Sequence, residues 1–542
     1  MSRRTIAFLA ANASYAHTNL AAWYLRAGID QERWEWHTIE TTVNDDPWCV
    51  LDRLAAAAPD VLALSVYLFN RPYVERLVRR FRILRPACVV IAGGPEFLGE
   101  NDDIIMRDPW CDVVIRGEGE LAFRAWTEHF DEPARWRTIS GACFRDGMRY
   151  RDGGMAICPE PLDDLPSPYA MTAMASKPFL QLETSRGCAN TCSFCTSGGG
   201  RVRRFGIARI RRELATIRAA NVRQVRIVDR TFNDNPRWCL RLLTMMRDEF
   251  NDMTFHLEID PARITPALCA ALAETAPGRF HLETGVQSLQ SAVYHAVGRQ
   301  ATVRRTYDGL ARLCALRRPA IHVDLIAGLP CATRNGLLDD LRQVVRLGPG
   351  AIQVELLKVL PGTALRRDSH RLGLLFAPDP PYEILATPTM THTDLQWARR
   401  LILAVDWFYN PPVLQPVIRQ AAADAADWWP RLIDFLSVRY APTITPGLET
   451  RFKVLDELFI GDLAACRHRL HYAWIFHGFS ARHGIVNAAG WKSAIPGGAV
   501  LVEGDPAAPA ARFVRATLDA DYIFAFTAGE GAGRRACAVY RV

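Results

Sequence analysis

The chain has 542 residues, of which 49% are hydrophobic and 23% charged, and its formal net charge at pH 7 is +7. These values are typical of a soluble globular protein with about three domains. No uninterrupted apolar run approaches the roughly 20 residues that span a bilayer. The 14 cysteines do not form a small-domain disulfide framework, so they indicate a reducing compartment. We therefore expect a cytoplasmic protein.

Residues 1–155 alternate strand-like and helix-like segments. The strand candidates are TIAFLAANA, EWHTIETT, DVLALSVYLFN, ACVVIAGGPEF and CDVVIRGEGE, and YVERLVRRFRIL is typical of the helices between them. Continuous apolar strands alternating with amphipathic helices predict an α/β fold with a parallel sheet covered on both faces. Such sheets bind ligands at the carboxyl ends of their strands. Gly93-Gly94 and Gly117-Glu118-Gly119 follow two of these strands and permit close backbone approach or tight turns.

Residues 156–178 are rich in Pro, Ser and small residues, which predicts a linker between domains. From residue 179 the strand–helix alternation resumes. Its six strands are FLQLETS, QVRIVDRTF, TFHLEI, RFHLETGV, AIHVDLIAGLP and AIQVELLKVLP. We predict a partial (β/α)6 barrel over residues 179–390, with its active groups at the carboxyl ends of the strands.

Residues 391–542 have a different character. Helical stretches rich in Trp and Ala come first, and shorter strand-like pieces broken by Gly and Pro follow after about residue 480. We predict a third domain of mixed structure that caps the open face of the barrel. Its tryptophans are expected to be core residues more often than parts of a ligand cage.

Three cysteines follow the first strand of the predicted barrel with the spacing Cys188-x3-Cys192-x2-Cys195, and Phe194 precedes the last of them. Three thiolates can hold three corners of a [4Fe–4S] cube, which leaves the fourth iron open to a substrate or cofactor. A zinc site would more naturally show two ligand pairs, and a redox pair would be a lone C-x-x-C. The spacing therefore predicts a site-differentiated iron–sulfur cluster.

The run QLETSRGCANTCSFC, together with HLETGVQSLQ, VGRQ and VDLIAGLP further on, resembles the motifs of the radical S-adenosylmethionine (SAM) superfamily. The resemblance covers roughly residues 179–360. It implies that the open iron chelates the methionine part of SAM. It also implies that an electron donor such as flavodoxin or ferredoxin reduces the cluster, which then splits the sulfonium.

One departure from the superfamily concerns SAM binding. The Gly-Gly-Glu motif that many relatives use to hold the SAM amine is missing at the second strand, where VDRTFN stands instead. The resemblance suggests Glu283, Asp229 and Tyr307 for catalysis. For contacts with SAM or substrate it suggests Phe194, Thr231, Asn233, Gln287, Arg299 and Asp324. Each acidic residue is equally well explained as a cap or an ion pair. If Glu283 approaches the open iron, SAM would bind elsewhere and react without a radical.

A flavodoxin-like domain before such a barrel resembles the cobalamin-binding class of radical SAM enzymes. The Asp-x-His-x-x-Gly motif of several cobalamin proteins is missing, and the spacing around His17 does not match it. The resemblance then implies cobalamin without a histidine below the cobalt, and a channel for its nucleotide tail. The residues implied are Ser65, Leu68, Asn70, Arg71, Gly93, Gly94, Glu96, Gly117 and Glu118. A degenerate domain without a cofactor is the alternative.

Together these resemblances imply a cobalamin- and SAM-dependent C-methyltransferase acting on a small molecule or peptide precursor. The class includes tryptophan 2-C-methyltransferases of thiopeptide antibiotic biosynthesis, which share the three-domain architecture. One alternative keeps both cofactors but carries out a cyclisation or rearrangement. Another is a cluster-containing nucleic-acid-binding protein that uses the arginines between residues 201 and 212. Those arginines are more often the solvated face of a helix, and they lack the interleaved aromatic residues of a single-strand binding platform.

Overall fold

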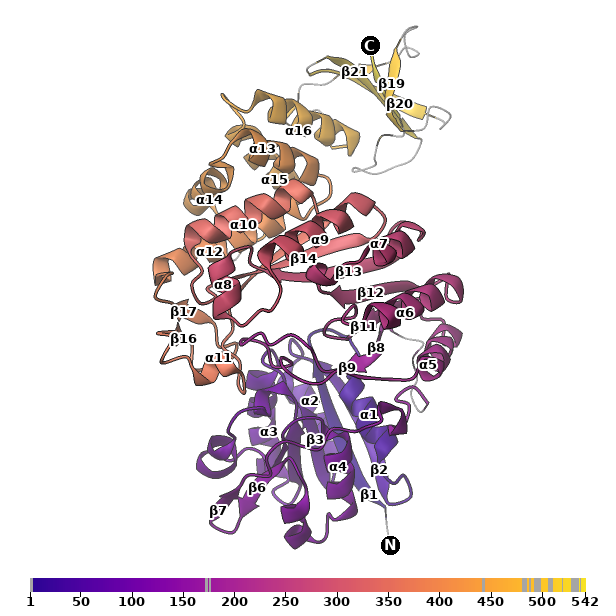
Figure 1. Cartoon of the computed structure of the whole chain (residues 1–542), viewed down its shortest axis with the longest axis vertical. Helices are drawn as coiled ribbons and strands as arrows, with labels where there is room; N and C mark the ends of the chain where they lie inside the picture. The colour runs from indigo at the N-terminus through magenta and orange to yellow at the C-terminus, as the bar shows by residue number, and fades with distance from the viewer. Residues whose placement is uncertain are drawn as a thin grey trace. The chain divides into compact units, whose positions relative to one another are not determined.

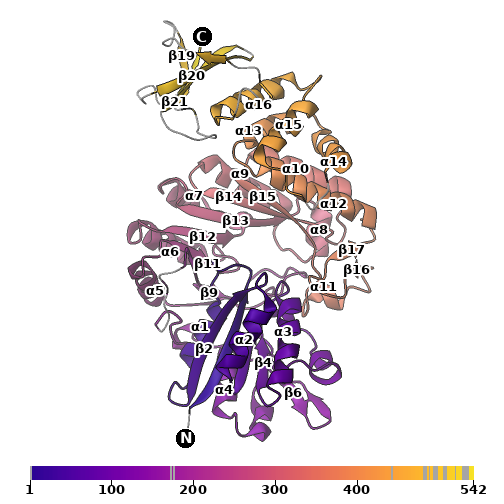
Figure 2. The ribbon, with the colours of Figure 1, turned by 180° about the vertical axis from the view of Figure 1, so that it is seen from behind.

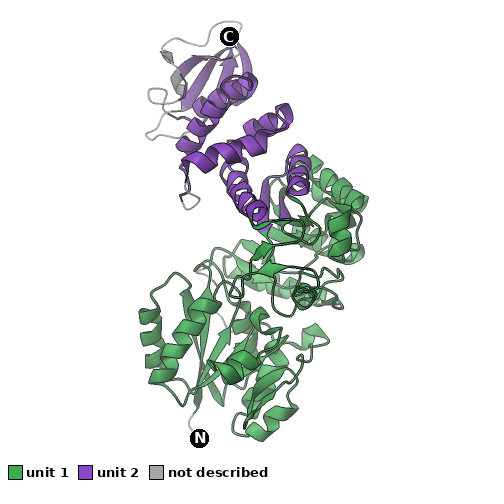
Figure 3. Ribbon diagram, turned by 90° about the vertical axis from the view of Figure 1, so that its left-hand side faces the viewer, with its two compact units in different colours: residues 1–321, 326–333, 356–392 green, residues 322–325, 334–355, 393–542 purple. Residues whose placement is uncertain are grey.

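The computed structural model describes residues 3–542 except 171–173, 175–176, 441–443, 480–484, 487–488, 492–498, 505–509, 519, 528–535 and 537. The chain divides into two compact units (Figure 3). Unit 1 comprises Met1–Ile321, Ile326–Thr333 and Leu356–His392, and unit 2 comprises His322–Leu325, Arg334–Glu355 and Thr393–Val542.

The N-terminal part of unit 1 is a seven-stranded sheet in the order β2-β1-β3-β4-β5-β6-β7 (Figure 1). Five parallel strands confirm the predicted sheet: β1 (Arg4–Asn12), β2 (Trp34–Thr42), β3 (Val61–Ser65), β4 (Val89–Gly93) and β5 (Val113–Ile115). An antiparallel hairpin that was not predicted from the sequence lies at its edge, formed by β6 (Ala142–Asp146) and β7 (Arg149–Arg151).

Helices cover this sheet, which is why its central strands are almost wholly apolar. The helices are α1 (Leu20–Gly28), α2 (Pro47–Ala57), α3 (Arg71–Leu84) and α4 (Gly119–Glu128), with short turns η1 (Pro95–Phe97), η2 (Asp103–Arg107) and η3 (Pro133–Thr138). Leu54 of α2 and Leu77 and Phe81 of α3 pack in one core with Leu9 and Leu62 of the strands. Helices α1 and α4 contact each other.

The second sheet has six strands in the order β15-β14-β13-β12-β11-β8, and these are the six predicted barrel strands. They are β8 (Leu180–Leu182), β11 (Gln224–Ile227), β12 (Thr254–Ile259), β13 (Phe280–Gln287), β14 (Ala320–Ala327) and β15 (Ala351–Leu356). The helices that follow the strands are α5 (Ile207–Ala219), α6 (Pro236–Asp248), η5 (Pro261–Arg263), α7 (Pro266–Ala273), α8 (Ser291–Ala296), α9 (Val303–Leu316) and α10 (Arg334–Leu347).

Side chains of β12 and β13 alternate between the two faces of this sheet. Phe255 and Leu257 of β12 are buried, as are Phe280 and Leu282 of β13. The residues between them, such as Glu258, are only half-buried on the opposite face. Parallel pairing sets these strands in register, with each charged side chain beside its counterpart on the next strand. The polar face is therefore the lumen side, where a site can form.

Shorter elements complete unit 1. Strands β9 (Ser185–Arg186) and β10 (Arg203–Arg204) pair, as do β16 (Leu375–Phe376) and β17 (Ile384–Ala386), and α11 (Ala364–Arg367) lies in the chain before β16. The described part of the segment predicted as a linker contains η4 (Leu162–Asp164). Leu162 and Leu165 are buried, and their carbonyls accept hydrogen bonds from Arg209.

Most of unit 2 is helical, with an antiparallel sheet near its end (Figure 2). Besides α10, its helices are α12 (His392–Ala404), η6 (Val405–Tyr409), α13 (Gln415–Asp424), α14 (Trp428–Arg439), α15 (Leu448–Leu458) and α16 (Ala464–Phe476). The sheet has the order β18-β20-β21-β22-β19, from β18 (Ala489–Trp491), β19 (Val500–Gly504), β20 (Ala510–Thr517), β21 (Asp521–Thr527) and β22 (Ala538–Arg541). Trp428, Trp429 and Trp474 are buried core residues. Among the described residues, no helix is long and apolar enough to cross a membrane.

Candidate functional site

The three predicted cluster cysteines lie on a loop that a short antiparallel ladder closes. Arg186 of β9 pairs with Arg203 of β10, and Ser185 pairs with Arg204. Gly187 follows β9 with a φ of 92°, and a Cβ there would lie 2.5 Å from the carbonyl oxygen of residue 201. Glycine is thus required where the loop turns away from the ladder.

The cysteines differ in their surroundings. Cys188 is buried, and its Sγ lies 3.5 Å from Thr231 Oγ1. The backbone N–H of Ser197 donates to Cys195 Sγ at 3.4 Å. Burial raises the pKa of the Cys192 thiol to about 11, and the positive charge of Arg299 opposes that rise. Hydrogen bonds to cysteine sulfur and nearby charge are the means by which a protein tunes an iron–sulfur cluster.

The cluster loop is anchored to the carboxyl ends of β12 and β13. Asn190 Nδ2 donates to Asp260 Oδ2 at 3.3 Å, and Thr191 Oγ1 donates to the Gly298 carbonyl at 2.8 Å. Arg299, which follows Gly298, donates to the Gly285 carbonyl at the end of β13 at 2.6 Å. Predicted residue Arg299 therefore lies beside the loop, as part of its support.

Asp260 is a site residue that the sequence analysis missed, although an acidic residue directly after a barrel strand was the available signal. It is 5% exposed and contacts Asn190 of the cluster loop. The amide side chain of Asn233 holds its backbone, donating to the Asp260 carbonyl at 2.9 Å and accepting from the Asp260 N–H at 2.8 Å. Predicted residue Asn233 therefore positions Asp260.

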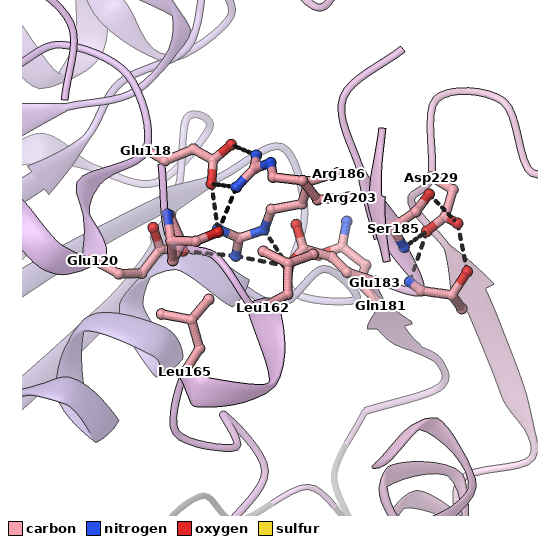
Figure 4. A network of polar contacts seen from close by, with 12 residues as sticks. Glu118, Glu120, Leu162, Leu165, Gln181, Glu183, Ser185, Arg186, Arg203 and Asp229 are labelled. Carbon is pink, nitrogen blue, oxygen red and sulfur yellow. Dashed lines mark hydrogen bonds and ion pairs between the residues drawn. The ribbon is translucent and has the colours of Figure 1, made fainter. Parts of the chain in front are cut away.

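Asp229, a predicted catalytic residue, holds the point where the chain leaves β8 for the cluster loop (Figure 4). It accepts from the backbone N–H groups of Thr184 and Ser185 at 2.7 and 2.9 Å, and from both of their hydroxyls. Burial raises the pKa of Asp229 to about 6 even though these hydrogen bonds lower it. Both carboxylate oxygens are thus engaged by the chain itself, so this geometry suits positioning of the loop.

Glu283, the other predicted catalytic acid, lies on the lumen face of β13. Its Oε2 is 2.8 Å from His256 Nε2 on β12, and the His256 and His281 ring centroids are 4.7 Å apart. Its neighbour in register is Glu258. Burial raises the pKa of Glu258 to about 7, the charge of Glu283 raises it further, and Arg230 opposes the rise. Glu258 was not predicted, although its place in the alternating HLE pattern was visible.

The remaining predicted SAM or substrate residues are scattered. Gln287 ends β13 with a φ of 67°, and its Oε1 is buried without a hydrogen-bond partner among the described residues. Phe194 is half-buried in the cluster loop. Asp324 lies on β14 in unit 2, 3.7 Å from His322 Nε2. Tyr307 lies half-buried on helix α9 rather than at a strand end.

A narrow cavity of about 130 Å³ opens at the carboxyl ends of β3, β4 and β5, between α1 and α4. Four of the predicted cobalamin residues line it: Ser65, Gly93, Gly94 and Gly117. Gly94 has a φ of 113°, and a Cβ there would lie 2.5 Å from the carbonyl oxygen of residue 66. Any larger residue at position 94 would therefore disturb the strand ends that shape this cavity.

Other predicted cobalamin residues lie elsewhere. Asn70 is buried and ties strand ends together by donating to the carbonyls of residues 11 and 65. Arg71 donates to Glu96 Oε2 at 3.1 Å and to Tyr382 Oη at 2.7 Å, and these three line a second cavity of about 1370 Å³. Leu68 is half-buried. The side chains of Asn70 and Arg71 are thus held by the protein itself.

Glu118, also predicted, belongs to a half-buried ion-pair network (Figure 4). The guanidinium of Arg186 lies 3.0 Å from Glu118, 2.7 Å from Glu120 and 2.8 Å from Glu183. Arg203 also pairs with Glu118. Because Glu118 and Glu120 begin helix α4 while Arg186 and Arg203 flank the cluster loop, the network joins the N-terminal domain to that loop.

The arginines that follow the cluster loop are mostly paired. Arg201 pairs with Glu160, Arg204 with Asp234, Arg209 with Glu213 and Arg211 with Glu249. Arg203 joins the network described above. This run therefore supports the fold of unit 1 at most of its positions.

The residues present fit the predicted cofactors. The described residues contain no group of three or more His, Cys, Asp or Glu placed to hold a metal ion. An iron–sulfur cube holds its thiolates at separate corners, and three cysteines on one glycine-rich loop suit that arrangement. The 130 Å³ cavity is too small for a corrin ring, and its glycine-lined, apolar shape suits a narrow part of a corrinoid.

Comparison with known families agrees with this geometry. Residues 182–344 match the radical SAM superfamily, and residues 6–127 match the B12-binding domain. The protein therefore combines a B12-binding domain, predicted from the N-terminal architecture, with a radical SAM domain, predicted from its motifs. These domains imply a [4Fe–4S] cluster, SAM and cobalamin.

Curated relatives are similar over about half of the chain. The cobalamin-dependent radical SAM methyltransferase TokK of Streptomyces tokunonensis is 27% identical over 57% of this chain and 48% of its own. The 2-(S-pantetheinyl)-carbapenam-3-carboxylate methyltransferase of Streptantibioticus cattleyicolor is 25% identical over 54% of this chain and 45% of its own. The protein thus spans about half the length of these relatives.

Solved structures show the same fold at low sequence identity. The radical SAM methyltransferase TsrM from Kitasatospora setae, with cobalamin and a [4Fe–4S] cluster bound, has a TM-score of 0.57 at 16% identity, covering 70% of this chain and 78% of its own. The cobalamin-dependent SAM radical enzyme OxsB has a TM-score of 0.59 at 12% identity, covering 87% and 79%. The α/β architecture predicted from the sequence is confirmed.

Proposed function

We propose that this protein is a cobalamin- and SAM-dependent C-methyltransferase that acts on a small molecule or a peptide precursor. The observation that carries the proposal is the half-buried ion-pair network, in which Arg186 beside the cluster loop contacts Glu118 and Glu120 at the edge of the B12-binding domain. The network supports the proposal because it joins the strand before the predicted cluster cysteines to the helix beside the predicted cobalamin cavity. The relatives named above as methyltransferases support the reaction type.

Cys188, Cys192 and Cys195 hold the cluster in this proposal. When bound, the cluster would supply an electron to the sulfonium of SAM on a radical route, and cobalamin would carry the methyl group. Asp260 and Arg299 keep the loop against the strand ends, and Asp229 fixes where the loop begins. The chain's own residues thus set the position of the thiolates before any cofactor binds.

Glu258 is our candidate for the proton acceptor. A carbon acceptor that attacks a methyl group as a nucleophile must then lose a proton, and a base with a pKa near the working pH serves best. Burial raises the pKa of Glu258 to about 7. The neighbouring carboxylate Glu283 is already in contact with His256. We therefore assign the proton transfer to Glu258.

Tryptophan is the first acceptor to test, because the chain resembles tryptophan 2-C-methyltransferases in its domain architecture and a TsrM structure holds tryptophan. A flavodoxin or ferredoxin is the electron donor we expect. A radical route would need that donor in each turnover, whereas polar methyl transfer would not.

Anaerobic reconstitution with iron, sulfide and hydroxocobalamin tests the proposal. Purified protein should retain cobalamin and show the absorbance of an iron–sulfur cluster, which Cys192→Ala should lose. Cys49→Ala, which changes an exposed cysteine of α2 far from the loop in sequence, is the matched control and should keep it. Retention of zinc in place of iron, or cobalamin that washes through, would contradict the assignment.

Methyl-deuterated SAM then identifies the reaction. Label recovered on carbon in the product is expected for a methyltransferase. A product altered without label would instead support a cyclisation or rearrangement. Salt-sensitive nucleic-acid binding by apo and cluster-loaded protein alike would support the nucleic-acid-binding alternative.

A further inference from the structure

The narrow cavity at the carboxyl ends of β3, β4 and β5 contains one charged lining residue. Its walls are small or apolar, with Ala21 and Leu25 from α1, Ile91 from β4 and Phe123 from α4. Glu120 is the only charged side chain among the residues that line it. A charged group in such a setting needs hydrogen-bond partners to offset its desolvation.

The two carboxylate oxygens of Glu120 have different surroundings. Oε1 lies 2.7 Å from a guanidinium nitrogen of Arg186. Oε2 is buried and has no hydrogen-bond partner among the residues that the structure describes. The side chain as a whole is 14% exposed. A buried acceptor left without a donor lowers stability unless a ligand supplies that donor.

We infer that Glu120 Oε2 accepts a hydrogen bond from the nucleotide tail of cobalamin, through a hydroxyl of its sugar. The inference rests on the proposed function, because cobalamin bound to the N-terminal domain needs a channel for its tail, and this cavity lies at the carboxyl ends of the strands of that domain. A flat base suits the apolar walls, and the sugar supplies the donor that Oε2 lacks. Glu120 is then a binding residue for the tail.

Glu120 is also shared between two sites. Its Oε1 holds Arg186, which stands two residues before Cys188 at the start of the cluster loop. The same carboxylate therefore contacts the cluster loop with one oxygen and the cobalamin tail with the other. Glu183 offers a matched comparison, because it pairs with Arg186 at 2.8 Å but does not line the cavity.

Binding of two corrinoids to the full chain tests this inference. Cobalamin carries the nucleotide tail, and cobinamide has the same corrin ring without it. Dissociation constants for both are measured by absorbance titration on wild type, Glu120→Ala and Glu183→Ala, with thermal melting to confirm folding. If Glu120→Ala does not fold, Glu120→Met keeps the side-chain length without an oxygen acceptor and takes its place.

Wild type should bind cobalamin more tightly than cobinamide. Loss of a hydrogen bond to a charged acceptor should reduce that preference about tenfold in Glu120→Ala, with cobinamide affinity unchanged, while Glu183→Ala keeps the wild-type preference. The inference is wrong if Glu120→Ala keeps the preference, or if Glu183→Ala loses it equally. Wild type that binds neither corrinoid would overturn the proposed function itself, and this inference with it.

Discussion

The guanidinium of Arg186 lies 3.0 Å from the carboxylate of Glu118, which places the strand that opens the cluster loop against the first residues of helix α4. The side chain of Arg186 is only 9% exposed, and it also lies over the ring of Tyr24 at 5.0 Å. A charge this buried is tolerated because several carboxylates surround it. The contact therefore lies inside unit 1, where it joins the strand before the predicted cluster cysteines to the helix beside the predicted cobalamin cavity.

Removing the Arg186 charge should destabilise the protein strongly. Arg186→Met leaves Glu118, Glu120 and Glu183 facing one another in a buried setting, so we expect a loss of about 3–5 kcal/mol in the free energy of unfolding. Chemical denaturation measures it. Arg211→Met is the control, because that arginine pairs with Glu249 at the surface and should change stability by less than about 1 kcal/mol. Equal effects of the two substitutions would contradict the buried network.

Asp229→Asn should lower the iron content of reconstituted protein. The asparagine side chain turns an N–H donor toward backbone N–H groups that need an acceptor, so the start of the cluster loop loses its fixed position. We expect less than half of the wild-type iron per chain in colorimetric assays, in protein that still folds. Asp252→Asn, an exposed change on the same unit, should bind iron normally. Full iron content in Asp229→Asn would show that the carboxylate does not position the loop.

The Glu258 carboxyl should make stability depend on pH. Burial raises its pKa from 4.5 to about 7, so between these pH values the folded protein keeps a proton that the unfolded chain has released. The stability of wild type should therefore fall as pH rises through this window, by on the order of 2 kcal/mol from this group. Glu258→Gln should remove that part of the slope in denaturation curves recorded from pH 4 to 8.

The same substitution tests the proposed role in proton transfer. Glu258→Gln should lower the turnover number by about 100-fold or more, a typical contribution of a general base, while cobalamin and iron content stay at wild-type levels. Turnover that is unaffected would exclude Glu258 as the proton acceptor. His256→Gln, which removes the neighbouring contact with Glu283 and the ring contact with His281 but keeps the Glu258 carboxyl, should have a smaller effect.

Tyr382 should contribute to stability through one hydroxyl. It is 2% exposed, and its hydroxyl donates to Glu96 Oε2 at 2.7 Å while accepting from Arg71. Tyr382→Phe leaves those partners short of a hydrogen bond, so we expect a loss of about 1–3 kcal/mol in the free energy of unfolding. Tyr15→Phe, at a residue that is 57% exposed, is the matched control, with an expected change below about 0.5 kcal/mol.

The parallel strands of the N-terminal sheet and of the six-stranded sheet were predictable, because the pattern of apolar residues that marks a strand lies within a few neighbouring residues. The cluster cysteines were predictable because their chemistry demands a fixed spacing. The β6–β7 hairpin was missed although Asp146-Gly147 stands at its turn with Gly147 at a φ of 62°, which is a recognised hairpin signal. That signal was available and went unused.

Residues whose role depends on tertiary register could not be found in this way. Glu120 matters because one side of α4 faces a cavity and Arg186, and nothing in GEGELAF reveals either neighbour. Asn70 and Asp229 carry polar groups of the kind that bind ligands, but their side chains form hydrogen bonds with backbone groups of the protein instead. A sequence shows which side chains can bind, whereas only the fold shows which remain available.

Lys177, whose side chain is 8% exposed, pairs with Glu40 at 2.8 Å and also donates to the carbonyls of Tyr15 and His17. A barrel fragment cut from residue 177 onward would lose Glu40, Glu118 and Glu120. The Lys177 ammonium and the Arg203 guanidinium would then have no counter-charge, and Arg186 would keep Glu183 alone. Such a fragment should aggregate instead of folding as an independent catalytic domain. A chimaera that joins this barrel to another corrinoid-binding domain would then need acidic residues in that domain at the positions equivalent to Glu40, Glu118 and Glu120.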